Sequence, residues 1–329
     1  MKFYAIALFA ILFGGLSNGC SASAPIPTLT IAPMLPASET PTASPVPASP
    51  VPATPVPTTL PPGPVHIIAV GDVMLGRQVN VEMIERKDFT WPFLNTADTL
   101  KQADLTMGNL EDPIVSYCRP SDGGDVLCAD PRAVAGLTFA GFDVMSLSNN
   151  HILDYGSDAF DGTDQYLKEA KINPVYMGSP VFLEINNNRV GVVAFDDSET
   201  ELNLDAAIAE VNSARGKVDI LIAILHWGYE YHPTASTRQE KVGHALIDAG
   251  VDLIIGAHPH WRQNVEMYNN RVIFYSLGNF VFDQMWSEET RKGNMADITI
   301  TPDKDGMTIT YDIIPIEIFT FGQPDFEKK

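Results

Sequence analysis

Short apolar runs that alternate with helical patterns are the feature of this chain that most constrains its fold. Runs typical of buried strands lie at residues 65–70, 104–108, 143–147, 218–225 and 251–255. Helical patterns lie at residues 131–140, 157–170, 203–214 and 235–249. This alternation predicts right-handed βαβ units and a largely parallel sheet.

Two Asn-rich turns interrupt the alternation and predict hairpins. One turn lies at 186–188, and another at 269–270 is followed by two strands expected near 295–301 and 307–313. We expect the late antiparallel strands to form a second sheet. A single α/β domain over residues 65–320 has an ordinary size.

Residues 1–20 have the pattern of an export signal. Lys2 precedes an apolar run at 4–16 that is too short to span a bilayer comfortably. Two endings remain open. The segment ending at Cys20 resembles a lipoprotein signal, in which that cysteine would be lipidated, although Ser17 stands where an apolar residue is usual. The other ending is cleavage after Ala24, which would release a secreted protein.

Residues 21–64 have the composition of a tether. They consist mainly of Pro, Ala, Ser and Thr and hold more than half of the chain's 25 prolines. Because this segment has too little apolar bulk to bury, we expect an extended, polyproline-rich stalk between a membrane or wall and the domain. A tail without function would have the same composition.

The net charge restricts the possible partners. The formal charge is −20, from 41 acidic and 21 basic residues, and residues 1–64 contribute only Lys2 and Glu39 to those counts. An acidic domain repels nucleic acid and anionic lipid headgroups. We therefore expect no nucleic-acid partner and membrane contact only through a lipid anchor, whereas a divalent cation is a natural companion.

Two cysteines lie close together in the domain. Cys118 and Cys128 flank a segment rich in turn-forming residues, RPSDGGDVL. In an oxidising compartment such a pair can close a short loop. We predict a disulfide between them.

Polar side chains follow five of the predicted strands. They are Asp72, Asn109 with Glu111, Asn150 with His151, His226, and His258 with His260. The carboxyl ends of parallel strands are where sites assemble, and these residue types bind divalent metals. Each has another explanation: a helix cap at Asp72, Asx turns at Asn109 and Asn150, or packing of His226 in the core. One shared site accounts for all five strand ends together.

The last of these strands is followed by two histidines. His258 and His260 are two residues apart, so in an extended segment both rings project to the same side. Pro259 between them disfavours a helix. They could serve one or two metal ions, or be ordinary polar loop residues.

At these residues the chain resembles two nested groups. The order of Asp72, Asn109, Asn150-His151, His226 and His258-Pro259-His260 resembles the calcineurin-like metallophosphoesterase superfamily. More closely, residues 65–316 resemble the CapA-type capsule-synthesis family, associated with poly-γ-glutamate, through GDVMLGR, GNLEDPI, AGFDVMSLSNNHILDYG, ILHWGYEYHP, IIGAHPHWRQNVE and YSLGNFVFDQ.

The resemblance implies a fold and a ligand set. The fold would be an α/β sandwich of two facing sheets flanked by helices, in α-β-β-α layers. The metal ligands would be Asp72, Asn150, His226, His258 and His260. The divalent metal would be Mn, Zn, Fe or Mg. His151 would act as general acid or stabilise a transferring phosphoryl group.

Two residues depart from the superfamily pattern. Met74 replaces a histidine ligand, and a thioether binds hard divalent metals poorly. Asn109 replaces the bridging aspartate, but Glu111 lies two residues on and could supply that carboxylate. One metal position is therefore expected to be weak or absent, or to depend on Glu111.

Further residues of the same motifs are candidates for catalysis and substrate contact. Asp154 could orient His151 or cap the following helix. The candidates for substrate binding are Asn109, Arg77, Trp227 and Asn279, with Tyr229, Tyr231 and Trp261 as further aromatic residues beside the ligands. Packing is the alternative for the aromatic residues.

These features predict an exported, surface-anchored protein of capsule or poly-γ-glutamate synthesis or export. The alternatives are a metal-dependent phosphoesterase or γ-glutamyl hydrolase, and a non-catalytic component that handles the polymer. Expected partners are an envelope polymer or a small phosphoester or γ-glutamyl substrate, and other capsule-synthesis proteins. A polyanion would need bound cations or a local basic patch, since Arg77, Arg262, Arg291 and Lys292 are scattered in the sequence.

Overall fold

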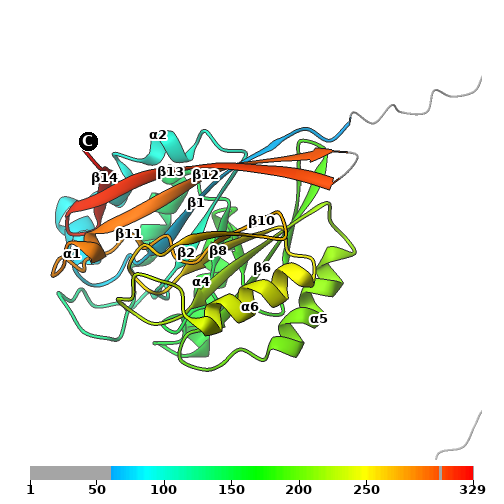
Figure 1. The fold of residues 1–329 in the computed structure, drawn as a ribbon. Coiled ribbons are helices and arrows are strands. Elements are labelled where there is room, and N and C mark those ends of the chain that lie inside the picture. The colour runs from blue at the N-terminus through cyan, green and yellow to red at the C-terminus, as the bar shows by residue number, and fades with distance from the viewer. Residues whose placement is uncertain (1–60, 304–305, 329) are drawn as a thin grey trace, which may run out of the picture. The chain divides into compact units, whose positions relative to one another are not determined.

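Two β-sheets lie face to face, with helices against the outer face of each (Figure 1). The computed structural model describes residues 61–303 and 306–328. The predicted signal segment, Cys20, Ala24 and nearly all of the tether lie outside these residues. The expectation of an α/β sandwich in α-β-β-α layers is confirmed.

The first sheet combines a parallel half with an antiparallel half. Its order is β14 (Gln323–Phe326), β13 (Gly306–Thr320), β12 (Lys292–Asp303), β1 (Val65–Val73), β2 (Leu105–Leu110), β3 (Val144–Ser146) and β4 (Asn173–Val175), and β11 (Asn279–Val281) also pairs with β1. Strands β1 to β4 are parallel, and β12 to β14 are antiparallel to their neighbours.

The second sheet has a parallel centre and an antiparallel strand at each edge. Its order is β5 (Val181–Ile185), β6 (Asn188–Asp197), β7 (Ile220–Trp227), β8 (Leu253–Ala257), β10 (Arg271–Phe274) and β9 (Val265–Tyr268). The predicted Asn-rich turns join β5 to β6 and β9 to β10.

The helices divide between the two outer faces. The helices on the first sheet are α1 (Arg77–Arg86), α2 (Ala97–Leu100), α3 (Val134–Ala140) and α4 (Ser157–Glu169), and those on the second are α5 (Leu204–Arg215) and α6 (Thr237–Asp248). Three short 3₁₀ segments are η1 (Trp91–Phe93), η2 (Pro131–Ala133) and η3 (Glu289–Arg291). Within the described part of the chain, no helix is long and apolar enough to cross a membrane.

Strand β1 is buried on both faces, which explains its nearly continuous apolar sequence. Ile67 and Ala69 pack into the core between the two sheets. Ile68 and Val70 point the other way, into the core beneath the helices of the first sheet. The alternation of side chains along a strand therefore fills two cores from one segment.

The placement of the late strands differs from the prediction of a second sheet. Strand β12 pairs antiparallel with β1, from Val65 opposite Ile300 to Val70 opposite Met295, and so extends the first sheet. The apolar residues of β12 complete the inter-sheet core on that side. The hairpin β9–β10 does belong to the second sheet.

The folded region extends beyond both predicted boundaries. At its start, the backbone N–H of Gly63 donates to the Asn186 carbonyl (2.8 Å), and the side-chain amide of Asn188 donates to the Gly63 carbonyl (2.8 Å). Residues 61–64, assigned to the tether by composition, therefore pack on the β5–β6 turn. At its end, β14 pairs with β13 past residue 320.

We expect Gly71→Ala to destabilise the fold strongly. A methyl group at this position would lie 1.9 Å from the Gly278 carbonyl oxygen, where β11 meets β1. Overpacking of backbone against backbone should lower the free energy of unfolding by about 3 kcal/mol in urea denaturation. Gly162→Ala in α4 is the control, because a methyl group there meets no atom within 4 Å. The control should raise the free energy of unfolding by at most about 1 kcal/mol. Equal changes in the free energy of unfolding for the two variants would contradict the close approach of Gly71 to the Gly278 carbonyl.

Candidate metal centre

The carboxyl ends of strands from both sheets converge on one buried cluster. Asp72 is the penultimate residue of β1 and lies in register with Asn109 of β2. His226 lies near the end of β7, in register with the last residue of β8, beyond which come His258 and His260. All five side chains are buried. The structure thus brings together residues that the sequence placed at separate strand ends.

Glu111 lies at the centre of this cluster. Its side chain is completely buried, and neither carboxylate oxygen has a hydrogen-bond partner among the described residues. Its Oε1 lies 3.9 Å from Nε2 of His226 and 3.7 Å from Nε2 of His260. An unsatisfied buried carboxylate is costly, so this position calls for a bound cation or a proton.

Two groups of possible metal ligands share this carboxylate. One consists of Glu111, His226 and His258, and the other of Asp72, Glu111 and His260, with the ligand atoms of each group within 4.8 Å of one another. Nδ1 of His258 lies 3.0 Å from Nε2 of His226. Two nitrogens bound at about 2.1 Å to one metal lie about 3 to 3.4 Å apart at right or tetrahedral angles. The donor set therefore fits one or two divalent ions, with Glu111 in the place of a bridging carboxylate.

The two histidines after β8 are held by strained backbone and by specific partners. Their φ angles are 97° for His258 and 56° for His260, in a region that non-glycine residues rarely adopt. The His258 N–H donates to Oδ2 of Asp72 (3.1 Å), and Nδ1 of His260 lies 2.9 Å from Oδ1 of Asn279. The turn directs the two rings to different ligand groups around Glu111.

Asparagine side chains contact the candidate ligands, and one of them, Asn150, also lines the cavity described below. The Asn109 amide donates to Oδ1 of Asp72 (2.9 Å), and its oxygen accepts from the Asn149 amide (3.1 Å). Oδ1 of Asn150 lies 2.8 Å from Nε2 of His226. Asn109 and Asn279 were candidates for substrate contact, but both are buried and their amides contact ligands. Asn149 was not singled out from the sequence, where only its neighbour Asn150 matched a motif.

Burial and charge shift the pKa values of the cluster in opposite directions. Burial alone would raise the pKa of Asp72, but the hydrogen bond and positive charge of His260 hold that pKa well below its usual range. Burial and the charge of Asp72 raise the pKa of Glu111 well above its usual range. Burial, then repulsion from a neighbouring imidazole, lowers the pKa of His226 and brings that of His258 to about 4. Both rings are therefore neutral at pH 7, with lone pairs free to bind a metal.

His151 lies beside the cluster and is paired with Asp154. Its Nδ1 is 3.0 Å from Oδ2 of Asp154, which also accepts the backbone N–H of Leu127 (2.6 Å). The alternative interpretation of Asp154 as a helix cap is wrong. Helix α4 begins at Ser157 after Gly156 and has no side-chain cap. Asp154 instead lies in the turn before the helix and faces His151.

A cavity of about 320 Å³ opens beside these groups. Its walls include Arg77, Asn150, His151, Tyr231 and His260. The Arg77 guanidinium is bonded to Asp283 and lies 5.3 Å from the ring centre of Phe282. The Tyr231 ring stacks on His260, with centroids 5.9 Å apart. The guanidinium of Arg77, the imidazole of His151 and the edge of the ligand cluster at His260 thus line the same cavity.

Trp227 does not line this cavity, so its interpretation as a substrate contact is wrong. Its side chain is fully buried, donates from the indole N–H to the Tyr275 carbonyl (2.8 Å) and stacks on the Tyr275 ring. Successive side chains of a strand point to opposite faces. Because His226 faces the ligand cluster, the next residue of β7 faces the core beneath α6.

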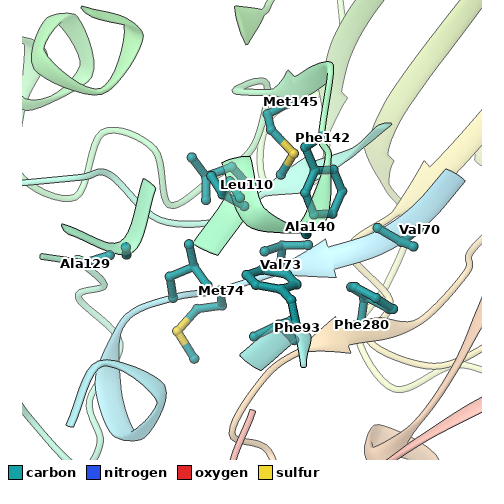
Figure 2. Close-up of a cluster of buried hydrophobic side chains, with 14 of the residues drawn as sticks. Val70, Val73, Met74, Phe93, Leu110, Ala129, Ala140, Phe142, Met145 and Phe280 are labelled. Carbon is teal, nitrogen blue, oxygen red and sulfur yellow. The ribbon is translucent and has the colours of Figure 1, made fainter. Parts of the chain in front are cut away.

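Met74 belongs to the apolar core and not to the ligand cluster. Figure 2 shows it among buried side chains that include Val73, Leu110 and Ala129. Its side chain is completely buried. Residue 74 therefore contributes apolar packing at the position where the superfamily motif has a metal-binding histidine.

Cys118 and Cys128, the pair expected to close a short loop, are joined by a disulfide. Leu127 and Asp125 of that loop also line the cavity. The disulfide therefore lies close to the candidate site.

Comparison with known proteins places these features in a family. The family model described as "Bacterial capsule synthesis protein PGA_cap" matches residues 66–284. The chain is 32% identical to the capsule biosynthesis protein CapA of Bacillus anthracis, over 76% of this chain and 66% of that protein, so it spans slightly less than two thirds of that relative. It is 31% identical to the PGA biosynthesis protein CapA of Bacillus subtilis, over 76% of this chain and 70% of that protein.

A more distant relative and a solved structure extend the likeness. A probable polyglutamine synthesis accessory protein of Mycobacterium tuberculosis is 25% identical, over 76% of each chain. The crystal structure of a hypothetical protein from Thermus thermophilus superposes with a TM-score of 0.50 at 16% identity, covering 77% of this chain and all of that one. The structural likeness supports the fold alone.

We expect Met74→His to lose stability without gaining a metal ligand. The imidazole would be buried among apolar side chains, which should lower the free energy of unfolding by about 1 to 3 kcal/mol. Met74→Leu, which keeps the volume, should cost less than about 1.5 kcal/mol. Urea denaturation and titration with Mn²⁺ or Zn²⁺ measure the two effects. Tighter metal binding at unchanged stability would show that residue 74 reaches the site.

Proposed function

This chain belongs to the bacterial capsule synthesis protein PGA_cap family, and from that premise we propose that it acts on an anionic envelope polymer or its precursor at a divalent-metal site. The polymer class follows from the names of its relatives, which refer to capsule and PGA biosynthesis. The proposed reaction is metal-dependent hydrolysis or transfer at a phosphoester or a γ-glutamyl amide.

The single observation that supports this proposal best is the environment of Glu111. Its carboxylate, with two orphaned oxygens, is shared by two histidine-containing ligand groups, one of which reaches the cavity through His260. A structural carboxylate in a core would be hydrogen-bonded or paired. This one is arranged as a metal ligand would be.

The residues around the cavity have distinct roles in the proposed reaction. A divalent metal held by Asp72, Glu111 and the three histidines would polarise the phosphoryl or acyl oxygen. His151 is held at Nδ1 by Asp154, which leaves Nε2 to exchange a proton with the reacting group. Arg77, fixed by Asp283, would balance the negative charge of the substrate.

The net charge favours a substrate that is bound with cations. A formal charge of −20 repels a polyanion at long range. Bound divalent metal would provide local positive charge beside the cavity, whose walls hold Arg77 together with the acidic residues Asp125, Glu199 and Glu230. We therefore place recognition at the cavity rather than over the whole surface. Other capsule-synthesis proteins are the macromolecular partners that we propose.

The test of this function uses purified protein loaded with Mn²⁺, Zn²⁺, Fe²⁺ or Mg²⁺. We expect bound metal by mass spectrometry and hydrolysis of phosphoester or γ-glutamyl substrates. Glu111→Gln should reduce both. His151→Gln should keep the metal and lower kcat by about 10²-fold or more, because a proton-transfer group is lost.

The matched control is His244→Gln. His244 also faces a carboxylate, Glu266, at 3.0 Å, but lies on α6 outside the cavity. It should leave metal content and kcat unchanged. A protein that binds no metal would overturn the proposed site. A protein that binds metal and polymer but hydrolyses neither substrate would have the non-catalytic, polymer-handling function.

We further propose that the protein is exported and anchored through a lipid on Cys20, with the Pro-rich segment as a stalk. The signal-like pattern of residues 1–20 supports this, and so does a disulfide in the domain, since disulfides persist mainly in oxidising compartments.

Replacement of Cys20 tests the anchor. We expect the wild type in the membrane fraction, extractable by detergent, and Cys20→Ser outside it, because a serine offers no thiol for lipidation. Ser21→Ala is the neighbouring control and should stay with the membrane. An identical distribution of wild type and Cys20→Ser between fractions, measured by immunoblotting, would favour cleavage after Ala24 and secretion.

A further inference from the structure

The loop closed by the disulfide, residues 118–128, forms one wall of the cavity through Asp125 and Leu127. We propose that the Cys118–Cys128 disulfide positions His151 and Arg77, so that the site is fully assembled only in the oxidised protein. The expected change in kcat rests on the proposed function, whereas the positioning of His151 and Arg77 rests on contacts between described residues. It makes Leu127 a positioning residue that acts through its backbone.

The first contact reaches His151. Oδ2 of Asp154 accepts the backbone N–H of Leu127 at 2.6 Å and lies 3.0 Å from Nδ1 of His151. The same oxygen therefore joins the loop to the imidazole. Leu127 directly precedes Cys128. The disulfide therefore restrains the backbone amide of Leu127, which in turn holds the carboxylate of Asp154. If the loop moved away, Asp154 would lose one of its two partners at that oxygen and the ring of His151 would lose its fixed orientation.

The second contact reaches Arg77 from the other side of the loop. Nη1 of Arg77 donates to the carbonyl of Gly124 at 3.3 Å. At the base of the loop, a methyl group added to Gly76 would lie 2.6 Å from the Cys128 carbonyl oxygen. The segment before α1 is therefore packed directly on the closed end of the loop. Arg77 itself has a φ of 44°, which requires support from its surroundings.

The middle of the loop has few contacts that fix its conformation, whereas the buried side chain of Leu127 packs into the core beneath the helices of the first sheet. Residues 119–126 are all exposed, and a methyl group at Gly123 or Gly124 would meet no atom within 4 Å. Its base is ordered by the hydrogen bonds of Val115 and Pro113 with Ala129 (2.9 Å each) and by packing of Cys128 against Ala159. A crosslink at the base restricts the conformations that such an exposed segment can adopt. Opening it would release both contacts with the cavity together.

The test compares the full-length, zinc-loaded protein with the double variant Cys118→Ser/Cys128→Ser and with wild type reduced by a phosphine. We expect kcat to fall about 10- to 100-fold, the range typical for loss of a group that orients a functional side chain, while zinc content stays unchanged. Asp154→Asn should reproduce this fall. Reoxidation of the reduced wild type should restore kcat, and Ser121→Ala, an exposed change in the same loop, should have no effect.

A second readout is independent of activity. In ¹⁵N-histidine NMR of the zinc-loaded protein, the Nδ1–H of His151 should be protected by its bond to Asp154 in the oxidised form. It should become exchange-broadened on reduction and in the double variant. If the double variant does not fold, the reversible reduction of folded wild type decides the question.

The two proposals fail separately. A protected His151 signal that persists after reduction, or an unchanged kcat, would overturn the role of the disulfide. An enzyme that hydrolyses none of the substrates would remove the proposed function, while loss of the His151 signal on reduction would still support the positioning by the loop.

Discussion

Two carboxylates buried at one point between the sheets are the constraint on which the site depends. Asp72 and Glu111 are both fully buried, and the charge of Asp72 opposes ionisation of Glu111. An apolar interior tolerates such a pair only with hydrogen-bond donors and cations close by. The asparagine amides, the backbone N–H of His258 and the imidazoles supply part of this compensation. The unsatisfied oxygens of Glu111 mark the part that protein groups do not supply.

The two-sheet architecture and the convergence of the candidate ligands could be predicted from the sequence. Both follow from the periodicity of apolar residues and from the order of strands and helices along the chain. Alternating strands and helices determine a parallel sheet, and a parallel sheet places all its carboxyl ends at one edge. Asp72, Glu111, His226, His258 and His260 follow from that rule. The short elements did not follow, since β11 and β14 are only three and four residues long, and β11 pairs with β1 far along the chain. Helix α1 lacks a capping side chain at Gly76, and Asp283, distant in sequence, accepts the N–H of Gln78.

The errors at single residues have one physical cause, which is the direction in which a side chain points. Trp227 adjoins a ligand in sequence but faces the opposite side of the sheet from His226. Met74, by contrast, was already expected to be a poor ligand from its sequence, and it packs into the outer core. Asn109 and Asn279 are polar and lie near the cavity, yet their partners are ligands rather than solvent. The position of a residue in the sequence predicts that it lies near the site. Whether its side chain points toward the site depends on the pleat of the strand and on the local turn.

The hydrogen bonds of Gly63 to the β5–β6 turn also have a mechanical meaning. The described chain enters the fold at one end of β1, and Asp72 lies near the other end of that strand, about 23 Å from Val65 for seven extended steps of about 3.3 Å (Figure 1). A pull on the entering segment is therefore borne first by the hairpin contacts and by the ladders of β1 with β2 and β12. These ladders would be loaded in shear along their length, so that many hydrogen bonds resist together. The far end of β1, near the cavity, would carry little of that load.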